Sequence, residues 1–306
     1  MGFVTTDFAA YETRKWSSNA FTLERLRVKE KLQMIGREMQ RRFGEQLAKA
    51  TLHFSDEFPS MLNGKKVEAQ WLYYCRAEQA ANELTQFLEK TQLTSDKVFQ
   101  LAPQEKHVAL SLYIDHEAVH LGVVLHPGAW VDRHNFSARL RHSWHRESFI
   151  QMANKAPQML TFGFADEQKP LHEISASALE SLAEPLHQDE RQFVVGARFS
   201  ASEVMTKGAA FAEEIFSLVS LLVPIYLFIA WDKENDHIEV SNQIRKEKAE
   251  QKKQVSGFKN GDKVRIVSGL FSGRNGIIQA IDGKSQVKVK IGRLAITVSG
   301  TDLAPL

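Results

Sequence analysis

The sequence predicts an α+β body with mainly antiparallel strands and long helices, followed by a small C-terminal β-barrel. Some stretches repeat apolar residues at steps of three and four, which is helical spacing, whereas others alternate apolar and polar residues like strands. The last fifty or so residues combine short alternating stretches with glycine at most corners, as a small barrel requires. We therefore expect a body at residues 1–232, a polar linker or exposed helix at 233–255, and a barrel at 256–306.

The composition is typical of a soluble globular protein with a basic C-terminal end. The chain has 306 residues, of which 43% are hydrophobic and 25% are charged. From residue 255 onward, eight Lys or Arg stand against three Asp, a net charge of +5 in a chain whose total is +2. The only cysteine, Cys75, excludes an intramolecular disulfide, and residues 1–10 do not have the pattern of a signal peptide. We expect a cytoplasmic protein whose basic end meets an anionic partner.

The first part of the body predicts a long helix, then a strand and a second helix. Apolar residues recur at helical spacing over residues 21–49, with mixed charges on the opposite side. The pair Asn63-Gly64 favours a tight hairpin turn, and residues 67–74 then predict a strand. Residues 77–93 predict a helix.

The clearest strand signal of the body is a hairpin. Apolar residues alternate with other residues over 108–114 and again over 119–125, with a polar connection between the two arms. The rest of the body predicts helices at 136–152 and 201–231 and strands at 159–164 and 193–199.

One uncharged run, residues 215–231, has two possible interpretations. Its 17 residues are at the short limit for a membrane span, and Pro224 interrupts it. Acidic residues flank it, with Glu214 before it and Asp232 after it, so no net basic flank sets an orientation. We expect a buried core helix that ends or kinks near Pro224, and no membrane partner.

The tail predicts about five short strands separated by glycine turns. Gly269, Gly273 and Gly276 let the chain bend tightly between the first two strands. The residue order GDxVxIxxGxFxGxxGxI, followed by VKVKI, GR and a terminal DL, resembles the C-terminal KOW domain of NusG-type transcription factors over residues 257–306. The resemblance implies an SH3-like barrel in which Gly276 is the KOW glycine and Phe271 the exposed loop aromatic.

The resemblance also implies a docking surface, because barrels of this family bind ribosomal proteins, termination factors, polymerase or RNA. We expect Phe271 to stack on a base or fill a pocket, and Arg274, Lys288, Lys290 and Arg293 to contact phosphates. A purely structural barrel with a solubilised outer face is the alternative. Upstream, nothing resembles the NusG N-terminal domain. We predict a non-enzymatic binding protein without a cofactor, whose partner is RNA or a transcription or translation protein.

A second motif suggests a different function. His116, Glu117 and His120 fit HExxH, and His126 follows as a possible third ligand. On a helix the histidines would bind zinc and Glu117 would activate water. The alternation of this segment predicts a strand, so a zinc-dependent hydrolase is only an alternative, as is a body that acts as a protein-interaction or inhibitor domain.

A second basic cluster follows the hairpin. It comprises Arg139, Arg141, Trp144 and Arg146. Basic residues interleaved with an aromatic suit a phosphate-rich ligand. A solvated helix face explains the same pattern, so both interpretations stay open here.

Overall fold

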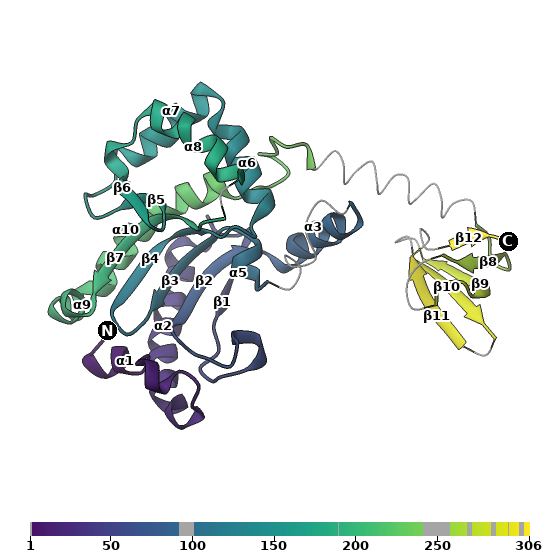
Figure 1. Ribbon diagram of the computed structural model, residues 1–306, viewed down its shortest axis with the longest axis horizontal. Coiled ribbons are helices and arrows are strands. Elements are labelled where there is room, and N and C mark those ends of the chain that lie inside the picture. The colour runs from purple at the N-terminus through teal and green to yellow at the C-terminus, as the bar shows by residue number, and fades with distance from the viewer. Residues whose placement is uncertain are drawn as a thin grey trace. The chain divides into compact units, whose positions relative to one another are not determined.

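The structure is a computed structural model, and it divides the chain into two compact units, Met1–Ile238 and Glu239–Leu306. It describes residues 2–91, 101–188, 190–240, 258–267, 271–282, 286–292, 294–299 and 303–306. The first unit is the body and the second holds the strands expected for the barrel (Figure 1). The first unit ends at Ile238, six residues beyond the predicted end of the body at 232. The reason is that the Trp231 and His237 amides hydrogen-bond to side chains of the body, Asp132 and Asn135.

The body is built on a seven-stranded sheet in the order β1-β2-β3-β4-β7-β5-β6. Its strands are β1 (Ala50–Phe54), β2 (Gln70–Arg76), β3 (Ala109–Ile114), β4 (Ala118–Leu125), β5 (Thr161–Phe164), β6 (Glu167–Pro170) and β7 (Phe193–Ser200). Every pairing is antiparallel, which confirms the predicted α+β class with mainly antiparallel strands. The predicted hairpin is the pair β3–β4, joined through Asp115.

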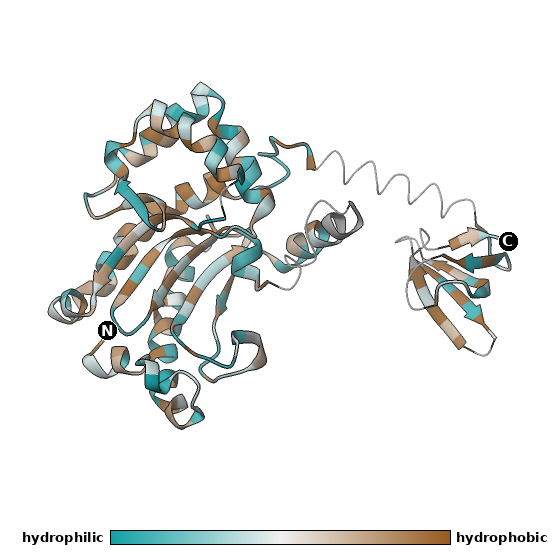
Figure 2. Cartoon of the chain, in the orientation of Figure 1, coloured by the Kyte–Doolittle hydropathy of each residue, from teal (hydrophilic) through white to brown (hydrophobic). Residues whose placement is uncertain are grey.

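One face of this sheet packs against two long helices, α2 (Thr22–Phe43) and α10 (Ala210–Ile229) (Figure 1). Leu110, Leu112 and Ile114 of β3 point into the core on this side, because side chains alternate along a strand. Figure 2 shows hydrophobic residues concentrated on α10 and on the central strands. The main core of the body therefore lies between the sheet and these helices.

Helix α10 contains most of the uncharged run and is the central core helix of the body. Among the described helices, it alone is long and apolar enough to cross a membrane by length and composition. Eleven of its residues are buried in the body. Its exposed positions form a single stripe at three- and four-residue steps: Ala210, Glu213, Ser217, Ser220, Pro224 and Leu227. The helix thus uses its apolar surface inside the protein, as expected of a core helix.

Shorter helices surround these layers. They are α1 (Thr5–Ala9), α3 (Glu78–Thr91), α5 (Pro103–Lys106), α6 (Trp130–Leu140), α7 (Ser143–Ala153), α8 (Ala176–Gln188) and α9 (Ala201–Lys207). Single turns of 3-10 helix are η1 (Thr13–Lys15), η2 (Asn19–Phe21), η3 (Met61–Asn63) and η4 (Leu171–Glu173). Helices α6, α7 and α8 pack on one another, and α6 and α7 also contact α10. The predicted end of the helix at 77–93 lies outside the described residues.

Two predictions for the first part of the body are wrong in detail. The helix predicted at 21–49 ends at Phe43, where Gly44 follows, and Ala50 already begins β1. Glycine disfavours a helix by about 1 kcal/mol relative to alanine. The residues after Gly44 lead into strand β1 and so cannot continue the helix. Gly64 has a positive φ of 64°, but it ends η3 inside a long connection and makes no two-residue hairpin.

Two predicted helices are each divided in the structure. The stretch at 136–152 belongs to α6 and α7, which separate at His142. The stretch at 201–231 divides into α9 and α10 at Gly208, whose φ is 52°. The helix does not end at Pro224, because α10 runs through this residue.

The second unit has five antiparallel strands in the order β11-β10-β9-β8-β12. They are β8 (Lys263–Ile266), β9 (Asn275–Asp282), β10 (Gln286–Ile291), β11 (Leu294–Ser299) and β12 (Leu303–Pro305). The last strand returns to pair with the first, so the sheet is barrel-like, with β11 and β12 as its two edges. A small core of its own fills the inner face: Val264, Ile266, Ile278, Val287, Val289 and Leu303.

Candidate nucleic-acid interface

Four exposed cations lie on the outer face of the second unit. Lys263 and Arg265 are on β8, and Lys288 and Lys290 are on β10. The residues that alternate with them are buried in the core of this unit: Val264, Ile266, Val287 and Val289. Because side chains alternate across a strand, all four cations point away from that core.

Strand β9 lies between the two cationic strands. Ile277 pairs with Lys263 on one side and with Lys290 on the other. Residues directly opposite one another lie on the same face of a sheet, so these three side chains form one row. Neighbouring strands are about 4.8 Å apart, so β8 and β10 are separated by roughly 9.6 Å.

In the described strand pairs, no acidic residue lies directly opposite a cation of this face. The cross-strand partners of the cations are all neutral: Asn275, Ile277, Ala280, Ala295, Thr297 and Ala304. Among the residues that the structure describes, none of the four cations takes part in an ion pair. Clustered positive charge creates a field that attracts anions.

Phe271 and Arg274 belong to the turn between β8 and β9, at the end of these strands. The Arg274 amide donates to the Phe271 carbonyl oxygen at 3.1 Å, and the Gly273 amide donates to the Ile266 carbonyl oxygen at 2.7 Å. Gly273 has a φ of 84°, which a residue with a Cβ rarely adopts. Phe271 is 37% exposed, so an aromatic edge is accessible at this end of the sheet.

Two predicted residues, Gly269 and Arg293, lie outside the described part of the chain. Gly276 is needed for close packing, since a Cβ at this position would lie 2.3 Å from a Val289 methyl and 2.9 Å from the Lys290 carbonyl oxygen. It therefore lets β9 lie close to β10. The structure thus brings Lys288 and Lys290 together with Lys263 and Arg265, and it keeps Phe271 and Arg274 at the turn.

The HExxH residues of the body lie on a hairpin. Asp115 and His116 form its turn, where Glu117 pairs with Arg198 at 3.0 Å. On β4, His120 Nε2 lies 3.1 Å from an Asp115 oxygen. Beyond β4, His126 Nδ1 accepts the Gly128 amide at 3.0 Å. His116 Nε2 also lies 3.7 Å from a Glu117 oxygen. No group of three His, Cys, Asp or Glu in the described residues is arranged to hold a metal ion.

The second basic cluster surrounds the corner between α6 and α7. The Arg139 guanidinium covers the Phe228 ring at 3.7 Å and donates to the Phe228 carbonyl oxygen at 2.5 Å. Arg146 donates to the Leu140 carbonyl oxygen at 2.7 Å. Arg139 and Arg146 thus donate hydrogen bonds to backbone carbonyl oxygens within the body.

The other two members of this cluster are more accessible. Arg141 lies 3.7 Å from a Glu184 oxygen, with both side chains exposed, and Trp144 is 59% exposed. Burial, with Arg139 beside it, lowers the pKa of His145 to about 4. His145 is therefore neutral at pH 7 and adds no positive charge to this corner.

A buried ion pair, which sequence reasoning missed, links the end of the body to its core. Asp132 is fully buried, and one of its oxygens accepts from Arg76 at 2.6 Å and from the Trp231 amide at 2.8 Å. Its other oxygen accepts from the Val108 amide at 2.9 Å. Burial is the main reason that the pKa of the neighbouring His107 falls to about 3.

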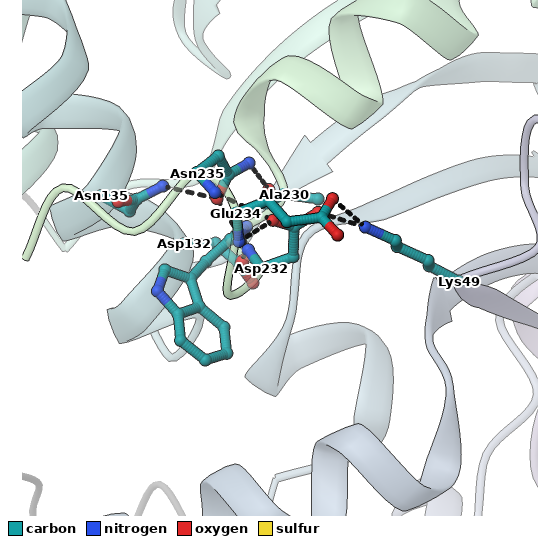
Figure 3. A network of polar contacts seen from close by, with 8 residues as sticks. Lys49, Asp132, Asn135, Ala230, Asp232, Glu234 and Asn235 are labelled. Atoms are coloured by element: carbon teal, nitrogen blue, oxygen red, sulfur yellow. Dashed lines mark hydrogen bonds and ion pairs between the residues drawn. The ribbon is translucent and has the colours of Figure 1, made fainter. Parts of the chain in front are cut away.

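The residues after Trp231 extend this network to the surface (Figure 3). Lys49 lies 3.1 Å from Asp232 and 2.7 Å from Glu234, and the Asn235 side chain bonds to the Ala230 carbonyl oxygen. These contacts fix the last described residues of the body, so the polar segment begins as part of this unit.

No family model matches the chain, and no curated protein matches it. The candidate interface is therefore argued from the geometry of the described residues. Lys263 and Arg265 were not among the predicted site residues. Their alternation with Val264 and Ile266 is a signal that the sequence contains, but only the strand register shows that they share a face with Lys290.

Proposed function

We propose that the second unit is a KOW-type, SH3-like barrel that docks the protein on RNA, alone or within the machinery of transcription or translation. The observation that carries the proposal is the row of Lys263, Ile277 and Lys290, continued by Arg265 and Lys288, with neutral partners throughout. Phosphate contacts from Lys and Arg supply most of the sequence-independent affinity for nucleic acids.

Three further features support this assignment. The strand order returns β12 to β8, as in a small barrel. Gly276 packs β9 closely on β10, which suits the KOW glycine of the resemblance. Phe271 is exposed beside the face, where an aromatic ring can stack on a base or enter a protein pocket. A cytoplasmic location goes with the proposal, and Cys75 is a buried free thiol.

The test is RNA binding by the full chain, measured by fluorescence anisotropy over a range of salt concentrations. Lys288→Glu combined with Lys290→Glu should weaken binding and reduce the slope of log affinity against log salt by about 1.4, because two lysines no longer neutralise a phosphate each. Both side chains are exposed, so the fold does not depend on them.

The matched control carries the same charge change on the body, at Lys155 and Lys169, which are also exposed. This variant should keep the affinity and the salt slope of the natural chain. Equal weakening by both variants would mean that net charge alone governs binding, and an unchanged K288E/K290E variant would refute the assignment of the interface.

A further inference from the structure

The outer face of the second unit has a neutral stripe between its cations. Asn275, Ile277 and Gln279 follow one another along β9, and all three are exposed. Ile277 is 45% exposed although it is directly between two lysines. An apolar side chain and two amides at the centre of a basic face suit a ligand that offers apolar surface and hydrogen-bonding groups as well as phosphates.

The width of the face argues against a duplex. The face covers three strands, β8, β9 and β10, whereas the major groove of B-form DNA is about 12 Å wide and admits a helix or a two-stranded ribbon. The major groove of an RNA duplex is narrow as well as deep. A duplex on this face would therefore offer it phosphates and sugars, and Ile277 would gain no apolar contact.

A single strand fits the stripe, because its bases are free to leave the stack. A base over Ile277 would bury its apolar surface, and the Asn275 and Gln279 amides can donate to and accept from base edges. A backbone that crosses the three strands meets Lys263 before β9 and Lys290 after it. We propose that this face binds single-stranded nucleic acid, with a base over Ile277 and phosphates on the cations of β8 and β10.

The inference rests on the proposed function and adds the form of the ligand. With four cations at phosphates, the slope of log affinity against log salt for a single strand should be about −3, at roughly 0.7 per phosphate. Because Ile277 carries no charge, its contribution is separable from that slope.

The experiment compares four fluorescein-labelled probes on the full chain by anisotropy: single-stranded oligouridylate and oligothymidylate of about 12 nucleotides, and RNA and DNA duplexes of equal length. We expect at least one single strand to bind about tenfold more tightly than either duplex.

Ile277→Thr keeps a β-branched residue in the strand and should weaken single-strand binding about fivefold with the salt slope unchanged. Asn275→Ala should also weaken it, which provides a second variant that leaves Ile277 in place. Leu294→Ser is the matched control, since Leu294 is another exposed apolar residue of this unit, at 52%. Amide hydrogen exchange of β10 checks that each variant is folded.

Duplex binding as tight as single-strand binding, or an Ile277→Thr variant that binds like the natural chain, would overturn this inference and leave the proposed function standing. Failure of all four probes to bind would overturn both. The two proposals are thus distinguishable in one set of titrations.

Discussion

Replacing the buried Asp132 by alanine should destabilise the body more than any surface substitution. Asp132 accepts hydrogen bonds from Arg76 and from the Val108 and Trp231 amides, and its side chain is shielded from solvent. Breaking a buried ion pair by removing one partner costs about 3–5 kcal/mol, and each buried amide left without an acceptor adds roughly 1–3 kcal/mol. Since such costs overlap, we expect the free energy of unfolding to fall by about 5 kcal/mol.

The assay is urea unfolding of the full chain followed by tryptophan fluorescence. All five tryptophans lie in the body, at positions 16, 71, 130, 144 and 231, so the signal does not report on the second unit. For a unit of this size, 1 kcal/mol corresponds to about 2–4 °C in Tm, so Asp132→Ala should lower the Tm by roughly 10–20 °C.

Asp166→Ala is the matched control, because it removes the same charge from an exposed pair with Arg191 at 2.9 Å. Exposed pairs contribute less than about 1 kcal/mol. A second variant, Arg76→Met with Asp132→Ala, removes the unpaired guanidinium and should recover part of the stability. A decrease below about 1 kcal/mol for Asp132→Ala, or one equal to the control, would refute this reasoning.

Three other residues, in both units, allow further tests. Gly276→Ala should destabilise the second unit by about 1–3 kcal/mol, because the new Cβ meets Val289, and hydrogen exchange should quicken in β9 and β10 but not in the body. The pKa of His107 is about 3 when folded and about 6.5 when unfolded, so the unfolded chain binds a proton first as the pH falls below 6.5. The free energy of unfolding should therefore decrease as the pH falls from 6.5 towards 3, by about 2 kcal/mol at pH 5. In His107→Gln, the midpoint urea concentration should depend less on pH over this range. Ser200→Ala removes the N-cap of α9, whose hydroxyl accepts the Glu203 amide at 3.3 Å, and should cost about 1 kcal/mol in the same fluorescence assay.

Sequence predicts those elements whose pattern follows from local burial. The hairpin β3–β4 is readable because its apolar residues face the helices, and alternate residues face the other side of the sheet. Helix α8 was missed, since Pro185 interrupts a pattern in which Leu179, Ala183 and Leu186 are buried at helical spacing. The pairs α6–α7 and α9–α10 are each predicted as one helix, because helical spacing of apolar residues does not reveal where the chain turns between two helices.

A sequence pattern does not show which strands pair, in which register, or which distant side chains come into contact. The neutral row beside the lysines depends on the register of β9 against β8 and β10, which no local periodicity specifies. The buried pair of Arg76 and Asp132 likewise joins residues from a strand and a distant helix. Both features come from long-range contacts, and so they become visible only in three dimensions.

The position of β7 in the sheet has a consequence for how the body is made. It joins the β1–β4 meander to the β5–β6 hairpin, yet it follows β4 in the chain only after three helices and that hairpin. Closing such a long loop slows folding, and α10, which covers the centre of the sheet, is synthesised later still. A nascent chain that stops before β7 exposes the unpaired edge of β4, and one that stops before α10 exposes an uncovered apolar face. Release of such fragments from the ribosome should lead to aggregation, so the body folds as a whole only once synthesis has passed Ile229.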